Sequence, residues 1–135
     1  MNQFIYSWIV ALFTMLGMDF VWLNLTVTKF YKIYLGHLFV SQINYIPAVL
    51  FYILYAAGLS YILLVPALKL GLDTYEVFLR GAVIGAMAYG AYDLTNHATL
   101  LNWPTIITIV DMMWGMFVTA MTSVITVVLL KTYFK

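Results

Sequence analysis

Three aspartates, Asp19, Asp93 and Asp111, stand inside long apolar stretches of the chain. Asp93 is followed one helical turn later by Asn96 and His97, so on a helix these three side chains share one face. Carboxyl groups held close together in a low dielectric cannot all ionise, so one can act as a general acid while its neighbour remains a base. We therefore predict a catalytic cluster in which Asp93 and His97 transfer a proton. Asp19 and Asp111 would position or tune that pair.

Aromatic side chains accompany these carboxylates. Asp19 and Trp22 are one turn apart, as are Asp111 and Trp114, which makes a repeated Asp-x-x-Trp motif. An inverted repeat would produce the same motif on two helices of opposite direction. A match of so few residues also arises by chance. The motif predicts an aromatic-lined pocket whose ligand-binding residues are Asn96, Thr99, Trp22, Trp103 and Trp114. Tyrosines of the second apolar stretch could also line a pocket, namely Tyr45, Tyr52, Tyr55 and Tyr61.

The composition identifies lipid as the solvent of most of the chain. Of its 135 residues, 65% are hydrophobic and only 8% are charged, whereas soluble domains carry roughly 25% charged residues. Eleven Tyr, nine Phe and four Trp exclude a disordered chain. Cysteine is absent, which excludes disulfides, thiolate metal sites and Cys nucleophiles. A net charge of +1 offers no basic patch, so nucleic acid is not an expected partner.

Four apolar stretches are long enough to cross a membrane, which takes about 20 residues. They are residues 4–28, 45–68, 75–97 and 104–130. Short connections between them predict an all-α, polytopic membrane protein, in which residues 1–135 form a single domain folded as an antiparallel bundle of four transmembrane helices. Pro47 and Pro104 fit the first turns of their helices, and Asp73 or Thr74 is placed to cap the third helix.

Residues 29–44, between the first two spans, are too polar and too few to cross a membrane. Lys29 and Lys32 alternate there with Tyr31 and Tyr34. This mixture suits an interfacial helix, with aromatic rings at headgroup depth and lysines reaching to water. An irregular loop fits the segment equally well.

Four spans place both termini on the same side of the membrane. That side carries Lys69, Arg80, Lys131 and Lys135, and the other side carries Lys29 and Lys32. Basic residues favour the cytoplasmic side, so both termini are predicted to be cytoplasmic. At about 1.5 Å per residue, Asp19 and Asp111 lie roughly 13 and 10 Å inside the external boundary. The polar pocket is thus expected to open toward the external face.

The third span carries small residues at helical spacing: Gly81, Ala82, Gly85, Ala86, Gly90 and Ala91. Small residues let helix backbones approach closely in lipid, where no hydrophobic drive brings helices together. The pattern predicts either a central position for this helix within the bundle or a homodimer seam along it.

Several motifs resemble a family of small bacterial membrane proteins known as DUF2177, a domain of unknown function. They are AYDLTNHATL at 91–100, NWP at 102–104, DMMWG at 111–115 and MDFVWL at 18–23. The resemblance covers essentially the whole chain. It implies four helices in a bacterial inner membrane and no established activity, with genes often placed near those of lipid-modifying enzymes.

Three functions remain open for the polar cluster. The first is an enzyme, or a binding protein, for a lipid or another hydrophobic small molecule, with membrane lipids as partners; a Mg²⁺ or Mn²⁺ ion held by the carboxylates is a variant of it. The second is a small transporter or a proton- or cation-conducting protein. The third is a structural or accessory subunit of a lipid-modifying system. No dinucleotide or phosphate-binding motif is present, so no soluble nucleotide cofactor is expected and the cofactor stays unknown.

Overall fold

The computed structural model describes residues 2–134, and over that range the chain is all-helical and contains no strand. The predicted all-α class is therefore confirmed. In chain order the helices are α1 (Asn2–Thr26), the π-helix η1 (Val27–Tyr31), α2 (Lys32–Leu35), the 3-10 helix η2 (Gly36–Leu38), α3 (Tyr45–Leu59), the π-helix η3 (Ser60–Leu64), α4 (Val65–Leu70), α5 (Thr74–Thr99) and α6 (Thr105–Tyr133). They make four legs: α1 to η2, α3 to α4, α5, and α6.

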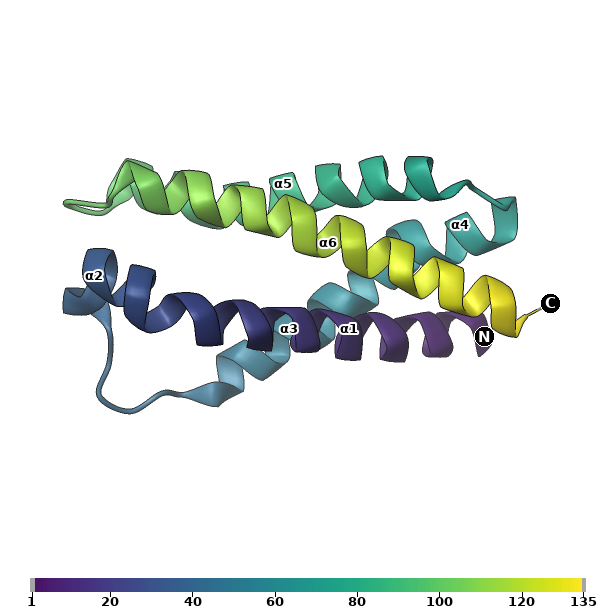
Figure 1. The fold of residues 1–135 in the computed structure, drawn as a ribbon, viewed down its shortest axis with the longest axis horizontal. Helices are drawn as coiled ribbons and strands as arrows, with labels where there is room; N and C mark the ends of the chain where they lie inside the picture. The colour runs from purple at the N-terminus through teal and green to yellow at the C-terminus, as the bar shows by residue number, and fades with distance from the viewer. Residues whose placement is uncertain (1, 135) are drawn as a thin grey trace.

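The legs run antiparallel in sequence order. Figure 1 shows both ends of the chain at one end of the molecule, together with the connection from α4 to α5, while α2 and the connection from α5 to α6 lie at the other end. Three legs are long and apolar enough to cross a membrane: Asn2–Leu38, Tyr45–Leu70 and Thr105–Tyr133. The fourth, α5, has 26 residues but is the least apolar of the long helices, since it carries Glu76, Arg80 and Asp93.

Local capping chemistry sets where the later helices begin. The Asn44 side chain accepts a hydrogen bond from the Ile46 amide (3.2 Å) at the start of α3. Asp73, one of the two predicted caps, accepts one from the Glu76 amide (2.8 Å) at the start of α5. Gly71 ends α4 in the left-handed conformation (φ 68°), which glycine adopts without steric penalty.

The end of the first leg differs from the sequence prediction. Lys29 does not stop the helix, because the backbone continues through the π-helical turn η1 and on to Leu38. Only residues 39–44 are free of helix before α3 begins. The predicted interfacial segment 29–44 therefore starts as a direct continuation of α1. Its π-helical start changes the direction of the side chains that follow, which matters for Tyr31 below.

Helices α5 and α6 form the closest pair in the molecule, and glycine makes the approach possible. A Cβ atom on Gly85 would overlap the Gly115 carbonyl of α6, and one on Gly81 would lie 2.9 Å from the Ala120 Cα atom. At Gly115 the Tyr89 ring covers the backbone and leaves no room for a side chain. The small-residue face of α5 is thus used within the chain, against α6. The central position predicted for α5 is instead held by α6, which packs against all three other legs.

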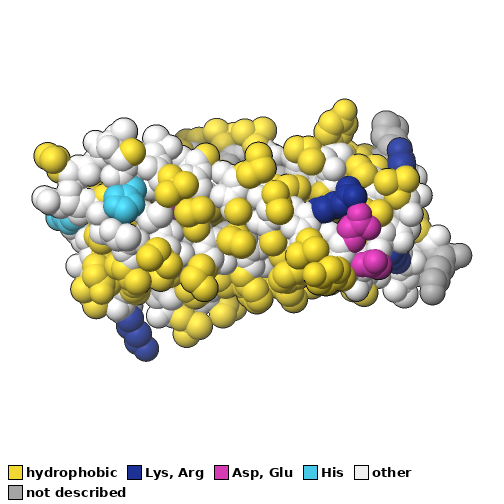
Figure 2. All heavy atoms as spheres, turned by 90° about the horizontal axis from the view of Figure 1, so that it is seen from above, with side chains coloured by type: hydrophobic (Ala, Val, Ile, Leu, Met, Phe, Trp, Pro, Cys, Tyr) yellow, Lys and Arg dark blue, Asp and Glu magenta, His cyan; other side chains and the backbone are white. Residues whose placement is uncertain are grey.

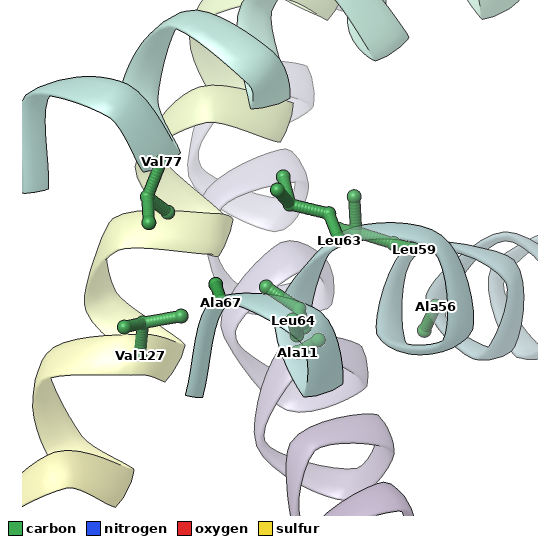
Figure 3. Close-up of a cluster of buried hydrophobic side chains, with 8 residues drawn as sticks. All are labelled: Ala11, Ala56, Leu59, Leu63, Leu64, Ala67, Val77 and Val127. Atoms are coloured by element: carbon green, nitrogen blue, oxygen red, sulfur yellow. The ribbon is translucent and has the colours of Figure 1, made fainter. Parts of the chain in front are cut away.

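A compact apolar cluster joins the four legs in the half of the molecule that holds the termini (Figure 3). Its buried members are Ala11, Ala56, Leu59, Leu63, Leu64, Ala67, Val77 and Val127. Because every leg contributes, the cluster holds the helices in register by close van der Waals packing, which is the main attraction between helices in lipid. The opposite half of the molecule has polar groups in this central position.

The outside of the bundle is hydrophobic along its length. Phe20 of α1 is 70% exposed, Leu54 of α3 69%, Met87 of α5 71% and Met113 of α6 66%. On the face shown in Figure 2, charged side chains lie toward the two ends and hydrophobic ones cover the middle. Exposed apolar surface of this extent is incompatible with water and suits a bilayer.

Candidate functional site

The two Asp-x-x-Trp motifs meet at the contact between α1 and α6. Helices α1 and α6 run in opposite directions (Figure 1), and Trp22 of α1 lies against Trp114 of α6. Their rings stack with centroids 4.4 Å apart and planes inclined by 5°. Stacked aromatic pairs contribute about 0.5–1.5 kcal/mol beyond their burial. The spacing of the motif therefore brings two carboxylates, one from each helix, to the two sides of one aromatic pair.

Asp19 is buried, with 5% of its surface exposed, and both carboxylate oxygens have donors. Oδ1 accepts a hydrogen bond from Trp114 Nε1 of α6 (2.7 Å), and Oδ2 accepts one from the Tyr52 hydroxyl of α3 (2.7 Å). Bonds to an ionised acceptor are stronger than those between neutral groups. Asp19 thereby ties α1 to two other legs.

Asp111 is held in a related way on the other side of the stack. Its Oδ1 accepts a hydrogen bond from the Tyr31 hydroxyl of η1, and that hydroxyl accepts one from Trp22 Nε1 (3.2 Å). Each tryptophan is thus hydrogen-bonded to the carboxylate of the opposite helix. Trp114 donates directly to Asp19, and Trp22 is linked to Asp111 through Tyr31. The arrangement has the approximate two-fold form that an inverted repeat would produce, and a common origin of the two helices stays a prediction.

A cavity of about 200 Å³ lies among these groups. Its lining consists of Asp19, Trp22, Leu23, Tyr31, Tyr52, Tyr89, Asp111 and Trp114. We call it the carboxylate cavity. Four residues of its lining, Asp19, Trp22, Asp111 and Trp114, are among the predicted site residues, and Tyr52 is one of the tyrosines singled out on the second span.

Two apolar grooves adjoin the carboxylate cavity. One, of about 500 Å³, shares Leu23, Tyr31 and Asp111 with it and is otherwise lined mainly by hydrophobic side chains between Val27 and Ile43; we call it the apolar groove. A second, also of about 500 Å³, lies on the other side and shares Asp19, Leu23 and Tyr52. Leu23 borders all three spaces. The carboxylate cavity therefore adjoins two hydrophobic grooves.

Asp93 of α5 is fully buried and does not line this cavity. Neither of its carboxylate oxygens has a hydrogen-bond partner among residues 2–134. Its carboxyl group is close enough to Asp111 for the two to interact electrostatically. Two carboxyl groups this close in a low dielectric repel each other when both are ionised.

The other predicted site residues gather at the end of the bundle, away from the cavity lining. The His97 ring nitrogens lie 3.4 and 3.3 Å from the hydroxyls of Thr105 and Thr108 on α6, and no hydrogen bond joins His97 to Asp93 within residues 2–134. Trp103 is buried and donates to Thr108 (3.0 Å). In the described part of the chain, the structure thus shows no direct hydrogen bond between Asp93 and His97, and His97 links α5 to α6 through the two threonines.

Two further predicted ligand residues lie on α5 itself. Thr99 is exposed and donates to the Thr95 carbonyl of its own helix (2.8 Å), and Asn96 is half-buried; neither lines the carboxylate cavity. The lining residues that sequence analysis missed are Leu23, Tyr31, which it placed at headgroup depth, and Tyr89. The two tyrosines contribute polar groups to the site. Nothing in the sequence marks either one, since Tyr31 depends on the π-helical turn and Tyr89 on the glycine contact with α6.

A polar stripe also runs along the inner face of α6, at three- and four-residue spacing. Its members are Thr108, Asp111, Gly115, Thr119, Thr122 and Thr126. Thr119 bonds to the Tyr55 hydroxyl (2.8 Å), whereas the buried hydroxyls of Thr122, Thr126 and Ser60 have no partner among the described residues. Polar groups therefore occur in both halves of the bundle, beyond the single half expected from the sequence.

The described residues contain no group of three His, Cys, Asp or Glu side chains suited to a metal ion. The geometry gives no support to the Mg²⁺ or Mn²⁺ variant of the site.

The long apolar helices and the hydrophobic exterior define a helical membrane protein with several candidate spans. The family model described as predicted membrane protein (DUF2177) matches residues 4–128, so the chain belongs to that family. This confirms the resemblance found in the sequence, and the family's description states no activity. No curated protein and no solved structure matches the chain.

The different settings of the aspartates predict opposite responses to removal of the charge. In Asp19→Asn the new amide group faces one of two donors, which leaves a buried donor unsatisfied and costs about 1–3 kcal/mol. In Asp93→Asn no hydrogen bond is lost, so stability is unchanged or higher. Thermal unfolding in one detergent compares the two variants with the parent protein. A loss in Asp93→Asn as large as that in Asp19→Asn would contradict this assignment.

Proposed function

We propose that this protein binds an amphipathic hydrophobic molecule, with its polar group in the carboxylate cavity and its apolar part in the apolar groove. The observation that supports the proposal is that the two spaces adjoin, with Leu23, Tyr31 and Asp111 lining both. Ligand sites are concave and mostly apolar, of about 300–1,000 Å³, with a few convergent polar groups. Membrane lipids and molecules dissolved among them are the candidates with direct access.

Any chemical change of the bound molecule would involve the carboxyl pair. Asp111 lines the cavity. Asp93, which interacts with Asp111, would hold one proton and exchange it with Asp111. Asp19 accepts two hydrogen bonds, so its carboxylate would keep its position and its charge during the reaction. His97, bonded to Thr105 and Thr108, would act at most from a distance. We therefore keep Asp93, Asp111 and Asp19 as the proposed reactive and positioning residues.

Mass spectrometry of molecules co-purified with the protein tests this proposal. Leu23→Trp puts a large ring at the junction of all three spaces, and Leu25→Trp, at a 61% exposed position outside them, is the matched control. The parent protein and Leu25→Trp are expected to retain the same amphipathic molecule, which Leu23→Trp loses. Total lipid extracts from cells with parent protein or Asp93→Asn then show whether the molecule is altered. Equal retention by all three proteins would overturn the binding site.

We propose further that all four legs cross a bacterial inner membrane and that both termini face the cytoplasm. At 1.5 Å per residue, the 26 residues of α5 span about 39 Å, more than the roughly 30 Å hydrocarbon core. Its outer face carries Val83 and Met87, 58% and 71% exposed. The basic residues Lys69, Arg80 and Lys131 lie toward the end that holds the termini, as the charge rule requires. The segment η1 to η2 would lie at the external interface.

This topology is tested by cysteine labelling, which the absence of native cysteine makes direct. Ser41→Cys, between η2 and α3, is expected to react with a membrane-impermeant maleimide on intact spheroplasts. Thr74→Cys, at the start of α5, is expected to react only after the membrane is opened. Both positions are exposed. The reverse pattern would invert the orientation, and labelling of both on intact spheroplasts would exclude α3 to α4 as a span.

The polar stripe of α6 favours proton conduction as a second candidate function. Buried hydroxyls without protein partners are commonly satisfied by internal water, and water joined to hydroxyl groups can carry protons. The stripe extends from Thr108, bonded to His97, past the carboxylate cavity to Thr126. It supplies the polar lining that the sequence did not predict in the half near the termini.

Proton flux in liposomes tests this second candidate. Reconstituted protein is expected to dissipate an imposed pH gradient faster than protein-free vesicles do. Thr122→Val removes one unpartnered hydroxyl at nearly constant volume and should slow the flux, whereas Thr132→Val, at an exposed position near the end of α6, should not. Flux equal to that of protein-free vesicles would exclude conduction.

A further inference from the structure

We infer that the polar group of the ligand is an organic ammonium ion, so that the carboxylate cavity selects hydrophobic cations. This inference rests on the proposed binding function and narrows its ligand class. It is carried by the charge of the lining, by the direction of its hydrogen-bond donors and by its aromatic composition.

The cavity is lined by acidic side chains and has no basic counterpart. Asp19 and Asp111 line it, Asp93 interacts with Asp111, and no Lys, Arg or His side chain borders it. Elsewhere, Arg80 pairs with Glu76 (2.5 Å) and Lys131 donates to the Leu72 carbonyl (2.5 Å). Electrostatic interactions are strong in the low dielectric of a membrane, so the cavity attracts a cation and repels a phosphate, sulfate or carboxylate.

The donors of the lining are directed at the carboxylates and leave few for a ligand. Trp114 and Tyr52 donate to Asp19. Trp22 donates to Tyr31, which donates in turn to Asp111. The Tyr89 hydroxyl is the one other polar hydrogen of the lining side chains, and it can turn to accept as readily as to donate. An anionic headgroup would therefore find one donor, whereas a cationic group finds several acceptor oxygens.

The remaining lining is almost entirely aromatic. Two Trp and three Tyr surround the cavity, with Leu23 as the single aliphatic member. Aromatic ring faces attract cations, Trp most strongly, and quaternary ammonium groups are recognised by such surroundings. A cavity of about 200 Å³ takes a small ammonium headgroup, and the adjoining apolar groove of about 500 Å³ takes the hydrocarbon attached to it.

Three probes with the same ten-carbon chain separate charge from hydrophobicity: decyltrimethylammonium, decanol and decyl sulfate. They are added to protein in maltoside micelles, which carry no ammonium group, and binding is measured as the rise in unfolding temperature with probe concentration. Decyltrimethylammonium is expected to bind the parent protein at least about tenfold more tightly than decanol, and decyl sulfate more weakly than either. Asp111→Asn is expected to reduce the preference for the cation, and Leu25→Trp to keep it.

The outcomes distinguish this inference from the binding function beneath it. If decanol or decyl sulfate binds as tightly as the cation, and Leu23→Trp abolishes binding of all three, the amphiphile site stands and selection for ammonium is overturned. If no probe stabilises the parent protein more than it stabilises Leu23→Trp, both are overturned. Because the three probes are compared on one parent protein, the result does not depend on the folding of Asp111→Asn.

A second arm identifies the source of the ammonium group. The same micelles are supplemented with phosphatidylethanolamine or with phosphatidylglycerol. Competition with decyltrimethylammonium by the first lipid alone indicates a lipid headgroup as the natural source. Absence of competition by either indicates a free hydrophobic cation. Stronger competition by phosphatidylglycerol, which has no ammonium group, would contradict the inference.

Discussion

The stacked tryptophans join α1 to α6, and each one supports the carboxylate of the opposite helix. A carboxylate inside a membrane-spanning helix costs about 2.5–3.5 kcal/mol on insertion scales. Trp114 offsets that cost for Asp19, and Trp22 does so for Asp111 by way of Tyr31. The aromatic pair and the acids therefore stabilise each other, and neither motif is satisfied unless the two helices pack side by side.

The position of the other helices follows from this contact. Tyr52 brings α3 to Asp19, and Tyr89 brings α5 to the same cavity by lying across Gly115. Gly85 lets the α5 backbone reach α6 closely enough for Tyr89 to do so. The apolar cluster in the other half fixes the relative angles of the legs but contributes no polar group to the site. Binding surface and structural core are thus separated along the length of the bundle.

Sequence patterns predicted the parts of the molecule that depend on local chemistry. The helical class, the Asp73 cap and the meeting of the Asp-x-x-Trp motifs all follow from residue type and helical spacing. The pairing of Asp93 with His97 did not follow, because a shared helix face leaves open which neighbour each side chain meets. Asp93 turns toward Asp111, while His97 reaches the first turn of α6. Tyr31 was missed because its direction depends on a π-helical turn that no residue type signals.

That turn has a mechanical consequence. The elements η1 to η2 continue the first helix without a break. The segment beyond the cavity is therefore joined directly to the part of α1 that carries Asp19 and Trp22, and the two would move together. Tyr31 connects this segment to α6 through its bond to Asp111. A displacement of the outer segment would therefore reach Asp19 through α1 and Asp111 through Tyr31. One continuous helical segment thus contributes lining both to the apolar groove and to the carboxylate cavity.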